Sequence, residues 1–283
     1  DTEINMLIHK GFKIYFYNST EIFFNKVVSK IDYKKSIIVF NNELDKLQNL
    51  ELRYPQLMKT INMSLDEFMI KYLRKLYLKN NLFLDFKTYN RINYFLKRFI
   101  DYTAVIVLSP ILIINLTIVI IIKFKNNLRD SLIFTQKRCG MNKKIFSIYK
   151  IRTMYSASSN ETNTTKDDCR IYPFAKFLRE LRIDEFPQII NILIGDMHLV
   201  GPRAEWVKLS NAYYQKIVNY DLRHIVRPGI TGWAQILYPY GRNEDDAKQK
   251  LMYDLYYIKN WSIWLEIEIC FKTFFVMLDK RGF

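Results

Sequence analysis

The heptapeptide Arg182-Ile183-Asp184-Glu185-Phe186-Pro187-Gln188 (RIDEFPQ) places two adjacent carboxylates between two segments with helical periodicity. Upstream, residues 173–181 predict a helix with its apolar side chains on one face. Downstream, residues 186–194 predict a second helix, in which Pro187 fits only the first turn. This puts Asp184 near the N-cap, where unpaired N–H groups and the helix dipole favour an ionised carboxylate. An ionised Asp is a competent nucleophile, although a plain helix cap beside a solvated Glu185 accounts for the same pattern.

The composition describes a globular protein with an anionic partner. The 283 residues, 49% of them hydrophobic, are enough to bury the core of one or two domains. A formal net charge of +15 indicates nucleic acid, an acidic membrane surface or a phosphorylated substrate as partner. The absence of helix-turn-helix, RNP and zinc-finger patterns disfavours nucleic acid.

Cysteine and histidine usage limits the metal chemistry. Cys139, Cys169 and Cys270 stand alone without CxxC spacing, so neither a disulfide framework nor a thiolate metal site is expected, and a reducing compartment fits. With only three histidines, any metal is expected to be a hard cation held by carboxylates and phosphates.

The first 90 residues predict a partial α/β domain. Residues 12–17 (FKIYFY) and 36–40 (SIIVF) have the pattern of short buried strands, with a helical stretch over residues 20–31 between them. No Gly-rich turn follows the first strand, which disfavours Rossmann-type dinucleotide binding. Ser64 and Glu67 form a capping box that predicts a helix to about residue 78. We expect a domain boundary near residue 90.

Residues 103–122 carry no charge and are long enough to cross a bilayer. Pro110, after Ser109, removes a helical hydrogen bond in the middle of this run, and the Ser hydroxyl can help to satisfy the freed carbonyl. Basic residues flank both ends, including Lys97 and Arg98 before the run, so the positive-inside rule places both ends in the cytoplasm. A re-entrant helix over about residues 99–124, which enters, breaks at Ser109-Pro110 and returns to the same face, is therefore favoured over a straight transmembrane helix or a buried core helix.

Residues 132–139 and 144–151 predict a basic β-hairpin. Its Arg138 and Lys150, with Arg152 just beyond, suit phosphate oxygens, although a basic face against anionic lipid explains the pattern equally well. Arg203 follows a tight turn at residues 200–203, and Arg227 opens a Gly-bearing turn whose N–H groups can approach an anion. Either could be an ordinary turn. Residues 157–168 predict a mobile polar loop, and residues 250–278 suit an interfacial or a core helix.

Taken together, the motifs resemble the bacterial sugar transferase family, the monotopic phosphoglycosyl transferases that start glycan assembly on a polyprenol phosphate carrier. The resemblance covers about residues 97–278 and includes the longer family members, which carry an extra N-terminal domain. Phe186, Ile151 and Ala204 depart from the usual family residues, but none of the three removes a reactive group. The motifs are KRFID (97–101), Ser109-Pro110, QKRCG (136–140), YKIRTM (149–154), RIDEFPQ (182–188), GDMHLVGPR (195–203), RPGITGWAQ (227–235), YPYG (238–241) and YDLYYIKNWS (253–262).

The resemblance implies an α+β fold: a re-entrant membrane helix and a helix-rich cytoplasmic catalytic domain with a small β-hairpin over residues 91–283, after the partial α/β domain of residues 1–90. It implies that Asp184 attacks the β-phosphorus of a nucleotide-diphosphate sugar and that polyprenol phosphate, in bacteria undecaprenyl phosphate, then accepts the phosphosugar. Glu185 is implied as Mg²⁺ ligand or base.

By electrostatic logic, the remaining phosphate charge is expected to fall on basic side chains of the hairpin and the two turns. The implied location is the cytoplasmic face of the bacterial inner membrane, with membrane lipids as further partners and exopolysaccharide, capsule or another glycan as the pathway. The expected phosphate-binding residues are Arg138, Lys150, Arg152, Arg203 and Arg227, and the expected membrane-contacting residues are Lys97, Arg98, Ser109 and Pro110.

Two rival functions belong to other classes. A non-catalytic protein that binds an anionic surface needs positive charge but no Asp184-Glu185 pair within it. A soluble regulator that binds nucleotide sugars is disfavoured by the apolar run of residues 103–122.

Overall fold

The computed structural model describes residues 37–40, 61–64, 67, 69–76, 89–126, 130–155, 169–238, 241 and 243–278. The chain divides into two compact units, Asp1–Tyr77 and Leu78–Phe283. The predicted strand of residues 12–17, the helix of residues 20–31 and the loop of residues 157–168 lie outside the described residues.

In the first unit, β1 (Ile37–Phe40) pairs in parallel with β2 (Ile61–Ser64), with Ile37 opposite Ile61. The strand predicted at residues 36–40 is confirmed, whereas the strand over residues 61–64 was not predicted. A short π-helix, η2 (Met69–Leu73), lies within the stretch predicted as a helix.

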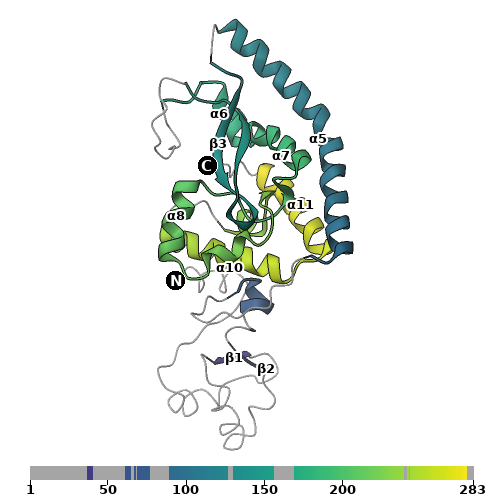
Figure 1. Cartoon of the computed structure of the whole chain (residues 1–283), viewed down its shortest axis with the longest axis vertical. Coiled ribbons are helices and arrows are strands. Elements are labelled where there is room, and N and C mark those ends of the chain that lie inside the picture. The colour runs from purple at the N-terminus through teal and green to yellow at the C-terminus, as the bar shows by residue number, and fades with distance from the viewer. Residues whose placement is uncertain are drawn as a thin grey trace, which may run out of the picture. The chain divides into compact units, whose positions relative to one another are not determined.

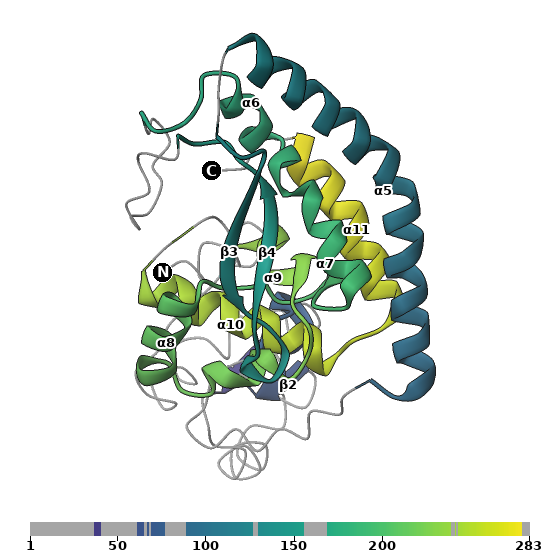
Figure 2. The ribbon, with the colours of Figure 1, turned by 45° about the horizontal axis from the view of Figure 1, so that its top comes forward.

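The second unit opens with α5 (Arg91–Lys125), a helix of 35 residues that bends partway along its length (Figures 1 and 2). Asn90 caps it, because its Oδ1 accepts the N–H of Asn93 at 2.8 Å. The predicted break at Ser109-Pro110 is not present, because the helix continues through Pro110 without interruption. The hydroxyl of Ser109 donates to the Ile106 carbonyl at 3.1 Å, the group that Pro110 leaves without its N–H donor, as the sequence predicted.

The predicted hairpin is confirmed. β3 (Ile133–Cys139) and β4 (Ile145–Ile151) pair antiparallel, with Ile133 opposite Ile151, and η3 (Met141–Lys143) forms the turn. Because side chains alternate along a strand, Arg138 of β3 and Ile148 and Lys150 of β4 share one face of this hairpin.

The two helices expected around the heptapeptide are also present, with a difference at the second. α6 (Ala175–Glu180) precedes it, the heptapeptide itself forms the 3₁₀ helix η5 (Ile183–Gln188), and α7 (Ile189–Ile194) follows. Pro187 thus lies in η5 rather than in the first turn of α7. Arg182 precedes η5 in the left-handed conformation, with a φ of 56°. Asp184 lies in the first turn of η5.

The stretch opened by Arg227 is a strand rather than an anion-binding turn. β6 (Gly229–Thr231) pairs in parallel with β5 (His198–Val200), and the N–H of Gly229 donates to the Pro202 carbonyl at 2.9 Å. The two backbones approach so closely that a Cβ on Gly229 would lie 2.0 Å from the amide nitrogen of Gly201. Only glycine fits at this close approach. The N–H of Gly229 already donates to Pro202, so it is not available to an anion.

The remaining helices complete the unit. α10 (Glu244–Lys259) packs as a core helix with eight buried side chains, so it is not interfacial, whereas α11 (Ile263–Leu278) has one buried face and one exposed face. Figure 2 shows α7 and α11 between the β3–β4 hairpin and α5. The remaining helices are α8 (Val207–Lys216), η6 (Tyr220–His224), α9 (Trp233–Leu237), α10 (Glu244–Lys259) and α11 (Ile263–Leu278).

One apolar cluster joins α5, β4 and α7 and places the heptapeptide. The buried members from α5, Val105 and Leu112, are seven residues apart and therefore share one face of the helix. The buried members are Val105, Leu112, Phe146, Ile148, Ile189, Ile192, Met197 and Ala204.

Candidate active site

The two carboxylates of the heptapeptide lie against the basic face of the hairpin. Asp184 and Glu185 are 9% and 8% exposed. Lys150 Nζ donates to Glu185 Oε1 at 2.7 Å, and Arg203 Nη2 lies 3.4 Å from the same oxygen. Within the described part of the chain, Asp184 forms no ion pair. Glu185 is therefore fixed by ion pairs, whereas Asp184 has none among the residues that the structure describes.

Their surroundings push the two carboxyl pKa values apart. Burial raises the pKa of Asp184 to about 6, with the charge of Glu185 adding to the rise and that of Lys150 opposing it. Burial also acts on Glu185, but there the charges of Lys150, Arg203 and Arg182 outweigh it and hold its pKa well below the usual range. Glu185 is a fixed anion, whereas Asp184 is ionised near neutral pH and close to its protonated form.

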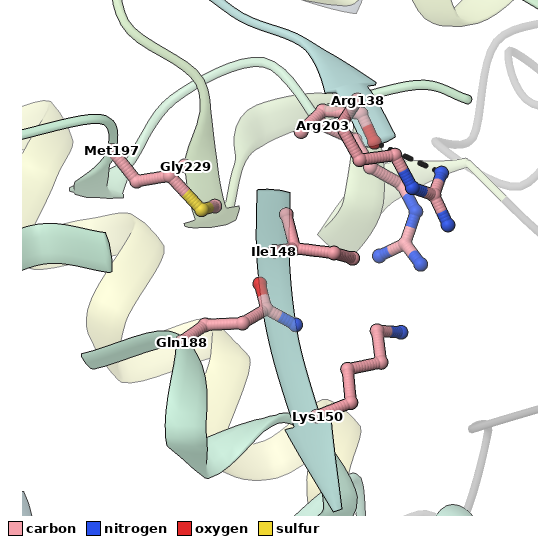
Figure 3. A pocket seen from close by; sticks show the side chains of 8 residues that line it. Arg138, Ile148, Lys150, Gln188, Met197, Arg203 and Gly229 are labelled. Atoms are coloured by element: carbon pink, nitrogen blue, oxygen red, sulfur yellow. Dashed lines mark hydrogen bonds between the residues drawn. The ribbon is translucent and has the colours of Figure 1, made fainter. Parts of the chain in front are cut away.

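A basic pocket opens beside this pair. Figure 3 shows the charged ends of Arg138, Arg203 and Lys150 pointing to the same side of β4. Arg138 Nη2 donates to Gln136 Oε1 at 2.7 Å and its Nη1 to the Ala204 carbonyl at 3.1 Å, which fixes the guanidinium in place. The residues that line the pocket are Arg138, Ile148, Lys150, Gln188, Met197, Arg203, Ala204 and Gly229.

A buried network lies behind Arg203. Arg223 is 5% exposed, donates to the Arg203 carbonyl at 3.0 Å and pairs with Asp254 of α10 at 2.8 Å. Its other guanidinium nitrogen donates to Tyr220 Oη at 2.6 Å. This network anchors the backbone of a pocket residue to the core helix α10.

Two predicted phosphate ligands lie elsewhere. Arg152 Nε donates to the carbonyl and to the hydroxyl of Ser131, at 3.1 and 3.0 Å, beyond the end of β4. Arg227 Nη1 donates to Tyr94 Oη of α5 at 2.7 Å. The structure does not bring Arg152 or Arg227 to the lining of the basic pocket, and their roles stay predictions.

Two of the predicted membrane residues also have partners in the protein. Lys97 is fully buried, and its Nζ donates to Glu266 Oε1 at 2.6 Å and to the Val200 carbonyl at 2.8 Å. Arg98 Nη1 donates to Asp101 and to the Ile192 carbonyl at the end of α7. These contacts fasten the first turns of α5 to the unit that carries the carboxylates.

The sequence reasoning did not assign a role to Gln188, Ile148 or Met197, which line the pocket. Gln188 ends the heptapeptide, so its place in the motif was the available signal. Ile148 and Met197 had no such signal in the sequence, because Ile and Met are common in any hydrophobic core.

A divalent cation fits this donor set only in part. Glu185 offers the hard oxygen that Mg²⁺ prefers. Among the described residues, no group of three or more His, Cys, Asp or Glu side chains could hold a metal ion. Diphosphate oxygens and water would have to complete the shell, as is usual for Mg²⁺ bound with a nucleotide.

Comparison with known proteins gives the same family along this unit. The family described as bacterial sugar transferase matches residues 92–280. The chain is 40% identical over 191 residues to UDP-N-acetylgalactosamine-undecaprenyl-phosphate N-acetylgalactosaminephosphotransferase of Aeromonas hydrophila, which covers 66% of this chain and 45% of that protein.

Two further relatives differ in the share of their own length that the match covers. UDP-glucose:undecaprenyl-phosphate glucose-1-phosphate transferase of Klebsiella pneumoniae is 39% identical over 194 residues, or 66% of this chain and 41% of that protein. The uncharacterised sugar transferase EpsL of Bacillus subtilis is 37% identical over 188 residues, or 66% of this chain and 89% of that protein. The match thus spans less than half of the Aeromonas and Klebsiella proteins but most of EpsL.

Proposed function

Since the chain belongs to the bacterial sugar transferase family, we propose that it transfers a sugar phosphate from a nucleotide-diphosphate sugar to undecaprenyl phosphate through an aspartyl-phosphosugar intermediate. The observation that supports the proposal is the difference in charge environment between Asp184 and Glu185. Glu185 is neutralised by Lys150 and Arg203, whereas Asp184 is buried beside them with its pKa raised to about 6. A carboxylate with little solvation and no ion-pair partner among the described residues is suited to nucleophilic attack.

The first step forms one bond and breaks one. An Asp184 Oδ attacks the β-phosphorus in line with the bridging oxygen, and the bond from that oxygen to the β-phosphorus breaks. The electron pair leaves with the nucleoside monophosphate. Arg138, Arg203 and Lys150 surround the pocket with positive charge, which stabilises the phosphoryl oxygens as charge shifts onto the leaving group.

The second step regenerates the enzyme. An oxygen of undecaprenyl phosphate attacks the same phosphorus, the bond to Asp184 breaks, and the carboxylate is free again. Arg138, Arg203 and Lys150 line the pocket independently of the nucleotide, so the pocket remains basic when the nucleotide leaves. Mg²⁺, held by Glu185 and the diphosphate, would neutralise charge on the leaving group.

The lipid acceptor requires a membrane, and α5 supplies the surface for it. Among the described helices, α5 alone is long and apolar enough to cross a bilayer, and only 17% of its most apolar window is buried. Its outer face carries exposed side chains that water would disfavour. The most exposed within the uncharged run are Ile106, Val107, Ile113, Ile114 and Ile120.

Both ends of α5 are fastened to the same unit. Lys97 near the start pairs with Glu266 of α11, and Lys123 near the end donates to the Asp130 carbonyl at 2.6 Å. We infer that both ends lie on one side of the membrane, with the outer face of the bent helix in the lipid. Because undecaprenyl phosphate and nucleotide sugars meet at the cytoplasmic face of the inner membrane in such a reaction, we place the unit there.

Mass spectrometry of the intact protein tests the nucleophile. The full chain is incubated with Mg²⁺ and UDP-N-acetylgalactosamine or UDP-glucose, the donors named for its relatives, without undecaprenyl phosphate. We expect a phosphosugar mass on the peptide that contains Asp184, and its discharge on addition of undecaprenyl phosphate. Asp184→Asn should abolish adduct and turnover, because an amide cannot supply the attacking oxygen.

Two matched variants sharpen the result. Asp221→Asn removes an exposed carboxylate whose nearest basic partner, Lys143, is 3.7 Å away, and it should form the adduct normally. Glu185→Gln should slow adduct formation while leaving the nucleophile in place. Normal turnover in Asp184→Asn would refute the mechanism. Absence of turnover with any donor in the unaltered protein would favour the non-catalytic rival.

A further inference from the structure

The backbone of β4 is bonded on both edges, although its sheet has two strands. β3 occupies one edge. On the other, the side chain of Asn191 bonds to two peptide groups of β4: its Nδ2 donates to the Ser147 carbonyl at 2.8 Å, and its Oδ1 accepts the Tyr149 N–H at 3.2 Å. A carboxamide has the same donor and acceptor as a peptide group, so Asn191 acts as a one-residue third strand.

Asn191 is fully buried and lies in α7, which follows η5 without a break. Its main-chain carbonyl accepts N–H groups from Gly195, Asp196 and Met197, at 3.1, 2.9 and 3.2 Å, and so ends the helix. One residue therefore ties together α7, the turn after it and the edge of β4. A buried amide with every group bonded is costly to replace, because any change leaves β4 peptide groups without partners.

The two elements that Asn191 joins carry the two sides of the candidate active site. Lys150 follows Tyr149 on β4, and Asp184 and Glu185 lie in η5, directly before α7. The ion pair between Lys150 and Glu185, at 2.7 Å, spans the same gap that the Asn191 amide bridges. A slip of β4 along α7 would move the ammonium group away from the carboxylates.

We propose that Asn191 is a positioning residue, which sets Lys150 against the Asp184-Glu185 pair by fixing the edge of β4 to α7. The proposal rests on the proposed function, since its readout is formation of the aspartyl adduct. Asn191 touches no substrate in this scheme. Its effect is exerted through Lys150.

A double-mutant cycle tests this dependence. Asn191→Leu keeps the approximate volume and removes both bonds to β4. We expect the rate of adduct formation, per folded protein, to fall about 10²-fold, the loss typical of a small misplacement of reacting groups. Lys150→Gln should also slow the reaction. If Asn191 acts through Lys150, the double variant should form the adduct only slightly more slowly than the slower single variant. Once Lys150 is replaced, loss of its positioning by Asn191 has no further effect on the rate.

Thr273→Val is the matched control. It removes the 2.7 Å bond between the Thr231 and Thr273 hydroxyls, which lies outside the pocket. Its adduct rate per folded protein should be unchanged, alone or combined with Lys150→Gln. If Asn191→Leu does not fold, Asn191→Ser replaces it, because its short side chain adds no bulk between α7 and β4 and cannot bond directly to both β4 peptide groups.

The outcomes separate the two proposals. Multiplicative losses in the Asn191 and Lys150 double variant, or an unchanged rate in the Asn191 variants, would overturn the positioning role. Absence of the adduct in the unaltered protein would instead overturn the proposed function. Non-additive losses beside an unaffected Thr273→Val support the inference.

Discussion

At the scale of single residues, the site depends on two neighbouring carboxylates in different surroundings. Burial dominates at Asp184 and raises its pKa, whereas the charges of Lys150 and Arg203 dominate at Glu185 and lower its pKa. Pairs of titratable groups whose pKa values are driven apart are a recurring sign of divided chemical roles. In the proposed mechanism, this division suits Asp184 to the attack and Glu185 to the charged support.

His198 gives a prediction of pH-dependent stability. Its Nδ1 lies 2.5 Å from Asp101 Oδ2, and burial lowers its pKa to about 4. The folded state therefore resists a proton that unfolded His198 takes up below about pH 6.5. We expect the free energy of unfolding to fall as pH drops from about 6.5 towards 4, by on the order of 3 kcal/mol from this residue.

Thermal unfolding in detergent over that pH range measures the effect. His198→Asn should be less stable than the unaltered protein at pH 7, yet lose less stability on acidification, since the titrating group is gone. An equally steep decline in the variant would show that other groups cause the pH dependence.

The sequence predicted the identity of the basic residues near the two carboxylates better than the direction in which each side chain points. Lys150 and Arg152 were both expected at the phosphate because their charged groups suit phosphate oxygens. β4 ends at Ile151, so the alternation stops and Arg152 turns to Ser131. Where a strand ends is set by its partner strand, which the residue pattern shows poorly.

At the scale of elements, the glycine motifs show a similar limit. Gly201 and Gly229 were expected in turns because glycine is common there. In the structure they let β5 and β6 approach, and a Cβ on Gly201 would lie 2.7 Å from the Arg227 carbonyl oxygen. Glycine is favoured both in turns and where two backbones approach closely. The second backbone is distant in sequence, so the sequence pattern alone could not distinguish a close approach from a turn.

For α5, the sequence predicted the apolar run and the role of Ser109 but not the full length of the helix. The helix starts at Arg91, eight residues before the predicted membrane segment at about residue 99. Its first turns carry the charged residues Arg91, Lys97 and Arg98, and tertiary contacts hold them, among them those of the fully buried Lys97. A lysine there was expected to face lipid headgroups, and only the fold shows that Glu266 neutralises it.

This ion pair gives a prediction at the junction of α5 and α11. Lys97→Met should lower the free energy of unfolding by about 3–5 kcal/mol, because it leaves Glu266 buried without its cation. Denaturant unfolding in detergent measures the change. Lys97→Met combined with Glu266→Gln should recover part of the loss, since no unpaired charge then remains.

Lys248→Met serves as the control for that experiment. It breaks the exposed pair between Lys248 and Glu244 on α10, at 2.9 Å, and should leave stability nearly unchanged. A small effect of Lys97→Met, similar to that of the control, would mean that water reaches Glu266 and that the junction is not a rigid clamp.

At the scale of the catalytic unit, α7 and α11 carry exposed apolar side chains as α5 does. Exposed aromatic side chains of α11 recur at helical spacing, and α7 adds three exposed aliphatic side chains. Apolar surface of this extent is unusual on a water-soluble monomer and suits contact with lipid. These residues are Trp264, Ile267, Phe271, Phe274 and Phe275 on α11, and Ile190, Leu193 and Ile194 on α7.

The proposed topology follows from both ends of α5 being fastened to one unit, and cysteine labelling tests it. Cysteines are introduced singly at Asn93 and Asn126, near the two ends of α5, with the exposed Cys169 changed to Ser. Lys248→Cys on α10 reports the side on which the catalytic unit lies. We expect an impermeant maleimide to label all three sites in inside-out vesicles and none of them in intact spheroplasts. The contacts of Lys97 and Lys123 hold both ends of α5 on the catalytic unit, so both ends should lie on the same side of the membrane as α10. Labelling of Asn93→Cys and Asn126→Cys from opposite sides would establish a spanning helix, and release of the protein from vesicles by alkaline carbonate would establish a core helix; either result would defeat the re-entrant arrangement.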